Sequence, residues 1–277
     1  DANVVIDPII EFTRTNNYES VTVEGNPFTA TVGGLIGAIH EIEGYLTNYS
    51  IQITNCSNNG EIEVTDVKND AQIGGLIGNM TKNGYFNVEI KDCSNQAKIS
   101  ALSSPNTYIV GGLIGWVSRN GRSNLTIAGC QNNRILNASG SHNDVGGFVG
   151  IVYSYDQSSS ISLFITNSAN KGSVSAGNGQ ACGMFFVDPY ATDNLNTTVL
   201  NSINKGSVNA TASAYGITNI ITKARNVVSM GEVNASYGSF TFWSSDDGVE
   251  KLYGLAGKCI NCYNPNIKLF EHNTSTG

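Results

Sequence analysis

A glycine-rich hexapeptide occurs four times in the first half of the chain, at nearly constant spacing. Val-Gly-Gly-Leu-Ile-Gly and close variants of it occupy residues 32–37, 73–78, 110–115 and 145–150. Their first glycines lie 41, 37 and 35 residues apart. Periods of this length are typical of arrays in which each unit buries its apolar face against its neighbours. The repeat therefore predicts an elongated fold with a long outer surface.

A second motif follows each hexapeptide. Ile-Thr-Asn-Cys-Ser-Asn-Asn-Gly-Glu-Ile at 53–62 recurs, with substitutions, at 90–99, 127–135, 165–174 and 199–208. Weaker copies lie at 228–233 and 261–267, and degraded hexapeptides lie at 181–184, 214–217 and 252–257. The motifs together indicate about seven units, of which the later ones are shorter.

Each unit contains three short extended segments. The first is the hexapeptide with its continuation, and the second alternates apolar and polar residues, as in 51–53 and 161–165. The third follows a turn dipeptide such as Asn59-Gly60. Strict alternation indicates half-buried strands, and Asn-Gly is typical of turns because glycine adopts positive φ without steric cost. No window shows the apolar spacing of a helix.

These patterns predict an all-β fold, a right-handed parallel β-helix (solenoid) of about seven coils with three strands per coil. A β-propeller is the rival all-β architecture, but its blades need four strands and about 40 to 50 residues. The later units, 33 and then 25 residues long, are too short for blades. Asparagine is frequent, which suits the corners of a solenoid, where side chains stack from coil to coil.

The chain divides into three regions. Residues 1–31 precede the repeats and contain apolar segments at 4–6, 9–12 and 20–23, which we interpret as N-terminal capping strands. Residues 32–238 form the regular β-helix coils. Residues 239–277 form degenerate last coils and a C-terminal extension that resembles the start of a linker. The first residue is Asp1, with no leader, which predicts a mature or excised ectodomain.

Composition excludes several classes of partner. The net charge is −7, and no basic run or basic–aromatic interleaving is present, so we expect no binding to nucleic acid or to an anionic membrane surface. No stretch of 18 apolar residues occurs, so we expect no membrane insertion by this segment. The location we expect is extracellular or at the cell surface.

Six cysteines fall into two groups and one singleton. Cys56, Cys93 and Cys130 are spaced by 37 residues, which predicts that they stack on adjacent coils about 4.8 Å apart. We interpret them as an inward-facing ladder, since Ser168 and Ser202 replace them later. A metal or redox site is the alternative, and a Cys56–Cys93 disulfide is a further candidate.

The other cysteines indicate no metal site. Cys259-Ile260-Asn261-Cys262 is a single CxxC without a second pair, so a local disulfide between Cys259 and Cys262 is the expected use in an extracellular chain. Cys182 stands alone, at a position where a glycine is expected. We therefore predict no metal and no cofactor.

Nine Asn-x-Ser/Thr sequons occur in the sequence. Eight are candidate N-glycosylation sites: Asn48, Asn79, Asn124, Asn137, Asn196, Asn209, Asn234 and Asn273. The ninth, Asn55, precedes a cysteine that we expect to be buried, so we expect it to be the poorest acceptor.

No catalytic constellation is evident. The three histidines, His40, His142 and His272, fall in unrelated registers, and no nucleophile, zincin, P-loop or dinucleotide motif occurs. Carboxylates gather near a lysine at 246–251 and at 66–70, but each group lies within one loop rather than across coils. Both are interpreted as solvated loops. No catalytic residue is therefore predicted, and the chain is not expected to be an enzyme.

The two motifs together resemble the GLUG-type repeat of large surface and adhesin-like proteins of bacteria and protists. The later segments 223–233, 257–262 and 269–273 resemble polymorphic surface proteins of parasitic protists such as trichomonads. The resemblance covers most of residues 32–277. It implies a β-helix at the cell surface or secreted, acting in adhesion, in coat formation or as an antigen, with no catalytic residues to transfer.

Three hypotheses for function follow. The first is a non-enzymatic β-helix surface protein that binds a host or cell-surface glycan or protein. The second is end-to-end self-association into extracellular filaments, because open solenoid ends expose unpaired strand edges. The third is a carbohydrate-active enzyme, a lyase or hydrolase. Aromatic residues are candidates for binding sugar without cleavage, namely Trp116, Tyr153, Tyr155 and Trp243.

Overall fold

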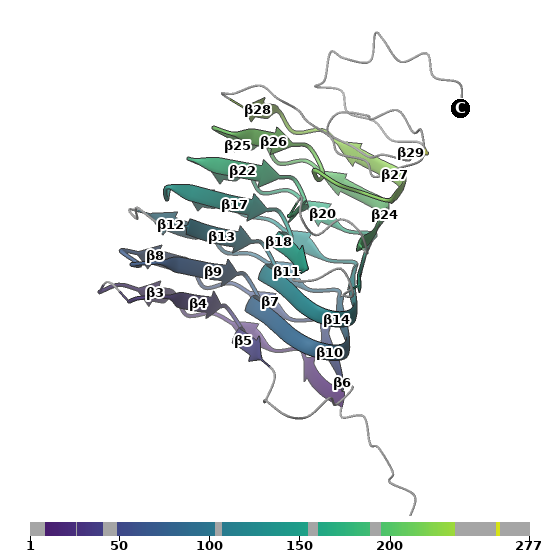
Figure 1. The fold of residues 1–277 in the computed structure, drawn as a ribbon, viewed down its shortest axis with the longest axis horizontal. Coiled ribbons are helices and arrows are strands. Elements are labelled where there is room, and N and C mark those ends of the chain that lie inside the picture. Colours follow the sequence, from purple (N-terminus) through teal and green to yellow (C-terminus); the bar gives the residue numbers. More distant parts are fainter. Residues whose placement is uncertain are drawn as a thin grey trace, which may run out of the picture.

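Parallel strand pairing runs through the structure, a computed structural model that describes residues 9–25, 27–40, 49–102, 107–154, 160–188, 195–235 and 259–260. These residues form strands, turns and bends but no helix. They wind into a parallel β-solenoid of about five turns. Figure 1 shows the strands of successive turns stacked in chain order, from the purple N-terminal end upward. The prediction of an all-β solenoid is confirmed.

Three sheets run along the solenoid. The seven-stranded sheet contains β3 (Val21–Val23), β8 (Ile62–Thr65), β12 (Ile99–Leu102), β16 (Leu136–Ala138), β21 (Val174–Ala176), β25 (Val208–Ala210) and β28 (Val233–Ala235). The six-stranded sheet contains β4 (Ala30–Gly33), β9 (Asp70–Gly74), β13 (Thr107–Gly111), β17 (His142–Gly146), β22 (Gly179–Cys182) and β26 (Ser213–Tyr215).

The sixteen-stranded sheet combines long strands with two-residue strands. Its long and medium strands are β1 (Ile9–Thr13), β5 (Ile36–His40), β6 (Tyr49–Thr54), β10 (Ile77–Lys91), β14 (Ile114–Ala128), β18 (Val149–Ser154), β19 (Ser160–Thr166), β23 (Phe185–Val187), β24 (Leu195–Asn204) and β27 (Lys223–Ser229). Its two-residue strands are β2 (Asn16–Asn17), β7 (Ser57–Asn58), β11 (Ser94–Asn95), β15 (Gln131–Asn132), β20 (Ala169–Asn170) and β29 (Cys259–Ile260).

The strands alternate between buried and more exposed residues, as the sequence predicts. In β19, Ile161, Leu163 and Ile165 are buried while the residues between them are half-buried. Pairing in register places Ile90 beside Ile127, and Ile127 beside Ile165. Like side chains therefore stack inside the solenoid, and the apolar core extends along its length. This packing is the source of stability expected for a repeat fold.

The glycine hexapeptide forms a corner between two sheets, not a continuous strand as we predicted. Gly74 ends β9, residues 75–76 form a bend, and Ile77 begins β10. A Cβ atom on Gly74 would lie 1.9 Å from the carbonyl oxygen of Ile77. A Cβ atom on Gly78 would lie 2.7 Å from the main-chain nitrogen of Val32. The hexapeptide needs glycine because its backbone packs closely around a sharp turn.

Asparagine side chains form a hydrogen-bonded ladder inside the solenoid. Each Nδ2 donates to the Oδ1 of the asparagine one coil further along, at 2.7–3.0 Å. The ladder consists of Asn17, Asn58, Asn95, Asn132, Asn170 and Asn204. From Asn58 onward these side chains are fully buried. Their amides are nevertheless paired, which removes the cost of burying a polar group.

The middle glycine of each corner packs directly against this ladder. A Cβ atom on Gly75 would lie 2.8 Å from the Cγ of Asn95 and 2.1 Å from the carbonyl oxygen of Gly112. A Cβ atom on Gly112 would lie 2.8 Å from the Cγ of Asn132. The two sequence motifs therefore occur together because the asparagine side chain of the second motif fills the space left by the glycine of the hexapeptide.

The terminal regions follow the register of the repeats where they are described. The predicted N-terminal strands at 9–12 and 20–23 correspond to β1 and β3, which pair with β6 and β8 of the next coil. The predicted strand at 4–6 lies outside the described residues. Of residues 239–277, the described part is β29, which pairs with β27.

Candidate functional site

The three stacked cysteines belong to the interior of the solenoid. Cys56, Cys93 and Cys130 are buried free thiols. The main-chain N–H of Cys56 donates to the Sγ of Cys93 at 3.3 Å, which confirms the predicted stacking. The thiol of Cys93 in turn donates to the carbonyl oxygen of Lys91 at 3.1 Å. Cys56 and Cys93 form no disulfide in the structure. Counting the reactive thiols of the purified protein tests whether that disulfide forms.

Serine replaces cysteine in later coils because the hydroxyl makes the same bonds. The N–H of Ser168 donates to the Oγ of Ser202 at 3.2 Å, and Ser202 Oγ donates to the carbonyl oxygen of Leu200 at 2.7 Å. The pKa of the Cys130 thiol is raised, mainly by its hydrogen bond with the Cys93 sulphur and secondly by burial. A neutral, buried thiol is a poor nucleophile, which supports a structural role.

The remaining cysteines occupy other environments. Cys182 is fully buried, and burial raises its thiol pKa. The predicted Cys259–Cys262 disulfide lies outside the described residues, since Cys262 is not among them. Within the described ranges, no three or more His, Cys, Asp or Glu side chains come together as metal ligands.

The sequons differ in exposure. Asn196 and Asn234 are exposed, whereas Asn124, Asn137 and Asn209 are half-buried. Asn79 is 8% exposed and donates its amide to the Oε1 of Gln72 at 3.1 Å, so it is the least accessible of those described. Asn48 and Asn273 lie outside the described residues.

Asn55 itself is exposed, although the next residue, Cys56, is buried as expected. The φ of Asn55, 54°, places it in a left-handed bend before the buried Cys56, and its side chain is exposed. The same bend recurs at Asp92 and Asn167, which also have positive φ and also precede a buried Cys or Ser. Asparagine and aspartate tolerate this backbone conformation better than other side chains.

The carboxylate and histidine candidates from the sequence are only partly placed by the structure. Asp66 and Lys68 are exposed in the loop that precedes β9, as expected for a solvated loop. Residues 246–251 and His272 lie outside the described residues. His142 is exposed at the start of β17. His40 ends β5, in an earlier coil than the one to which His142 belongs.

A second apolar cluster lies on the outer side of the corner between the six-stranded and sixteen-stranded sheets. Its buried members are Ile109, Ile151, Cys182, Phe186 and Tyr215, and Trp116 packs against them. We call these six residues the corner cluster. In this region Cys182 pairs in register with Gly146, so its side chain occupies a place that is glycine in the preceding coil. Where the hexapeptide departs from its repeated sequence, residues that replace its glycines therefore contribute side chains to the cluster.

Asp144 is the charged side chain that borders the corner cluster. It pairs in register with Ile109, a member of the cluster. It is 5% exposed, and its Oδ1 has no hydrogen-bond partner. Burial raises the pKa of this carboxyl to about 6; His142 lowers the pKa and Asp188 raises it. The pattern of the repeat did not reveal Asp144, because the same position is Gln72, Ile109 and Gln180 in neighbouring coils.

Two aromatic candidates from the sequence meet at the same corner. The ring centroids of Trp116 and Tyr153 are 6.0 Å apart, with the planes inclined by 55°. Trp116 and Tyr153 are both half-buried, and the indole Nε1 of Trp116 is buried without a hydrogen-bond partner. The other two aromatic candidates, Tyr155 and Trp243, lie outside the described residues.

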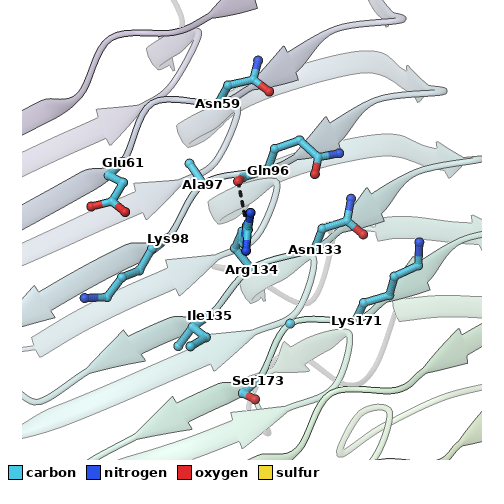
Figure 2. A pocket seen from close by; sticks show the side chains of 11 residues that line it. Asn59, Glu61, Gln96, Ala97, Lys98, Asn133, Arg134, Ile135, Lys171 and Ser173 are labelled. Atoms are coloured by element: carbon cyan, nitrogen blue, oxygen red, sulfur yellow. Dashed lines mark hydrogen bonds between the residues drawn. The ribbon is translucent and has the colours of Figure 1, made fainter.

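A shallow groove crosses several coils on another face of the solenoid. Figure 2 shows its side chains, which come from four successive coils. Its volume is about 540 Å³, and its lining includes three cations, Lys98, Arg134 and Lys171, and one carboxylate, Glu61. Arg134 donates to the carbonyl oxygen of Gln96 at 3.2 Å. The groove is locally positive although the chain is acidic. We call it the basic groove.

No family model, curated protein or solved structure matches this chain. The resemblance to GLUG-type repeats over residues 32–277 therefore stays a prediction. Among the described residues, no helix is long and apolar enough to cross a membrane. The corner cluster with Asp144, and the basic groove, are the two outer features on which a function can be argued.

Proposed function

We propose that this chain is a non-enzymatic solenoid of the cell surface or extracellular space that acts in adhesion or as a surface coat or antigen. One observation carries the proposal: inward positions repeat from coil to coil, whereas outward positions change. In the six-stranded sheet, inward Val110 and Val145 pair with each other. In the sixteen-stranded sheet, by contrast, the half-buried outward positions that pair in register are Gln52, Glu89, Thr126 and Phe164. A repeated interior with a varied exterior is typical of solenoids that present binding surfaces.

Two outer features support a binding role. Trp116 of the corner cluster and the neighbouring Tyr153 are half-buried aromatic rings, and the basic groove offers cationic side chains on an acidic protein. The resemblance to GLUG-type surface proteins points to the same role. The exposed sequon asparagines Asn196 and Asn234 are the candidates best placed to carry glycans if the protein is secreted by a eukaryote.

In its finer form, the proposal is a right-handed β-helix of seven coils with three strands per coil. Residues 1–31 would cap the first coil. The strands β3 and β4 support this arrangement, since they pair in register with β8 and β9 of the first regular coil. Crossovers between parallel strands are right-handed in nearly all proteins.

Surface exposure is the experiment that tests this function. Antibodies against the purified chain should label intact source cells or their culture medium, and external protease should remove the signal from intact cells. Treatment with peptide-N-glycosidase should increase the electrophoretic mobility of the protein if sequons are occupied. Retention of the protein inside sealed cells, protected from protease, would contradict the proposal.

The same purified chain tests the two alternatives. Negative-stain electron microscopy would reveal filaments if solenoid ends associate. Incubation with a polysaccharide panel, followed by an assay for new reducing ends or unsaturated products, would reveal an enzyme. We expect single rods and no cleavage.

A further inference from the structure

The three cations of the basic groove lie on three successive coils, each at a different place in the turn. Counted from the ladder asparagine of the same coil, they are the third, second and first residue after it, namely Lys98, Arg134 and Lys171. Successive coils are about 4.8 Å apart and successive residues about 3.3 Å, so neighbouring cations start from Cα atoms about 6 Å apart. Figure 2 shows them spread across the groove, so the positive charges form an oblique line.

These cations remain available to a ligand. All three are exposed, and within the described part of the chain none of them forms an ion pair. Arg134 donates from Nε to the carbonyl oxygen of Gln96, and Lys171 donates from Nζ to Oε1 of Gln131 at 2.7 Å. These bonds to neutral oxygens hold the side chains in place without neutralising them. The terminal nitrogens of Arg134 are left to bind a carboxylate or sulfate, which guanidinium groups do bidentately.

The balance of charge in the groove favours an anionic ligand. Three cations face a single carboxylate, Glu61, which gives a local charge of +2 on a chain whose net charge is −7. Charges on the surface are screened over about 8 Å at physiological ionic strength. A ligand in the groove therefore interacts mainly with the groove cations, and the acidic groups elsewhere on the chain repel it only weakly.

The neutral groups of the groove suit a polyhydroxylated ligand. Side-chain amides of Asn59, Gln96 and Asn133 line it, together with the hydroxyl of Ser173. Amides and hydroxyls both donate and accept, as sugar hydroxyls do. Ile135 is an exposed apolar side chain among them, on which the C–H face of a sugar ring can lie.

Two other classes of anionic ligand fit less well. A peptide that docks on a sheet does so by pairing with an unpaired strand edge. Here the main chain is already paired between coils, since the N–H of Gln96 donates to the carbonyl oxygen of Asn58, and that of Asn133 to the carbonyl oxygen of Asn95. Single-stranded nucleic acid is held largely by stacking on aromatic rings. The groove lining contains no aromatic residue among those that the structure describes.

We propose that the basic groove binds an acidic polysaccharide. Its carboxylate or sulfate groups contact Lys98, Arg134 and Lys171, and its hydroxyls bond the side-chain amides beside them. This inference deepens the proposed adhesive function and rests on it for its biological meaning. Binding is measured on the purified full chain, so failure of surface labelling would overturn the function and leave the groove standing. Failure of glycan binding would overturn the groove and leave surface exposure standing.

The test is a calorimetric titration of the full chain with two acidic probes and one neutral probe. Oligogalacturonate carries carboxylates, heparin-derived oligosaccharide carries sulfates as well, and dextran oligosaccharide of similar length carries no charge. We expect at least one acidic probe to bind, at least about 10-fold more tightly than dextran, and its affinity to fall as the ionic strength rises. Comparison of the two acidic probes shows which oxyanion the groove prefers.

A matched pair of triple variants places the binding in the groove. The groove variant combines Lys98→Gln, Arg134→Gln and Lys171→Gln. It should bind about 30-fold more weakly, since each exposed charge contact contributes about 3-fold. The control variant also removes two exposed lysines and one exposed arginine, but on long strands of the sixteen-stranded sheet, through Lys91→Gln, Lys223→Gln and Arg225→Gln. The net charge changes equally in both, and we expect the control to lose less than about 3-fold.

Glu61→Gln gives a prediction of the opposite sign. Removal of the one groove carboxylate should strengthen binding by about 2-fold, a gain that misfolding cannot produce. The absence of binding by both acidic probes at millimolar concentration would overturn the proposal. Equal affinity for the groove and control variants would overturn it too, with melting curves confirming that both are folded. Tighter binding of polyglutamate or oligothymidylate than of either acidic glycan would assign the groove to a peptide or a nucleic acid instead.

Discussion

Asn95 donates a hydrogen bond of 3.0 Å from its side-chain amide to the side-chain oxygen of Asn132, one coil further along the solenoid. Both side chains are fully buried. The same amide also donates to the carbonyl oxygen of Ala97 at 2.8 Å. Asn95 therefore links two coils and closes the turn that follows it, so the ladder holds both the stacking and the local bend.

Replacing Asn95 by Ala should destabilise the protein by about 3–5 kcal/mol, because it leaves several buried groups unpaired. The amide of Asn58 would lose its acceptor, and Asn132 and Ala97 would lose a donor. Chemical denaturation monitored by circular dichroism measures the change. Gln96→Ala is the matched control, since Gln96 is the exposed next residue, and we expect it to cost less than about 0.5 kcal/mol. Equal effects would contradict a structural role for the ladder.

Gly112→Ala should prevent correct stacking of the coils. The new Cβ would lie 2.1 Å from the carbonyl oxygen of Gly147 and 2.8 Å from the Cγ of Asn132, and neither atom can move without disturbing the ladder. We expect a loss of more than about 3 kcal/mol, or insoluble protein. Gly177→Ala is the control, because its Cβ would approach other atoms no closer than 3.3 Å. Equal melting temperatures for the two variants would show that the corner accepts a side chain.

The periodic parts of the fold could be predicted from the sequence because they depend on like residues in register. The spacing of Cys56, Cys93 and Cys130 predicted their stacking, and the alternation at 161–165 predicted the burial pattern of β19. The frequent asparagines predicted stacking from coil to coil. In each case the repeat itself supplies the contact, so one period contains the necessary information.

The remaining features depend on contacts between different parts of a coil. The hexapeptide looked like a strand because its apolar residues flank glycines, but the close approach between Gly75 and Asn95 makes it a corner. The corner cluster combines residues of two sheets, such as Ile109 and Phe186. Asp144 breaks the repeat instead of following it, so periodicity gives no signal for it.

The Cys/Ser exchange along the stacked column predicts opposite outcomes for two substitutions at Cys93. Serine can accept the N–H of Cys56 and donate to a carbonyl, as Ser168 and Ser202 do, so Cys93→Ser should cost less than about 1 kcal/mol. Cys93→Ala leaves the buried Cys56 N–H unpaired and should cost about 1–3 kcal/mol. Denaturation curves compare the two, and an alanine variant as stable as the serine variant would argue against the hydrogen-bonding role.

Thiol counting separates the cysteine groups. Cys56, Cys93, Cys130 and Cys182 are buried thiols, so they should not react with Ellman's reagent in the native protein. After unfolding without reductant, we expect these four thiols to react. Cys259 and Cys262 should not react if they form the predicted disulfide. Two reactive thiols instead of four would show an additional Cys56–Cys93 disulfide, and six would show that no disulfide is present.

Asp144 makes stability depend on pH with a definite sign. Burial raises its pKa to about 6 in the folded protein, above the usual carboxyl value of 3.8, so the folded state binds this proton more tightly than the unfolded state. The resulting stabilisation is complete below pH 3.8 and is lost as the pH rises through about 6. Its full size is about 3 kcal/mol, from a shift of roughly two pH units.

Asp144→Asn removes that titration, so the difference in unfolding free energy between wild type and variant should change between pH 4 and pH 7. We expect the variant to be the more stable protein at pH 7 and its advantage to shrink as the pH falls. Urea denaturation at several pH values measures both curves, and Glu63→Gln serves as the control for the removal of a carboxylate elsewhere. Parallel curves for wild type and Asp144→Asn would mean that the Asp144 carboxyl is solvated in the folded protein, which would also remove the argument for an unpaired acceptor at the corner.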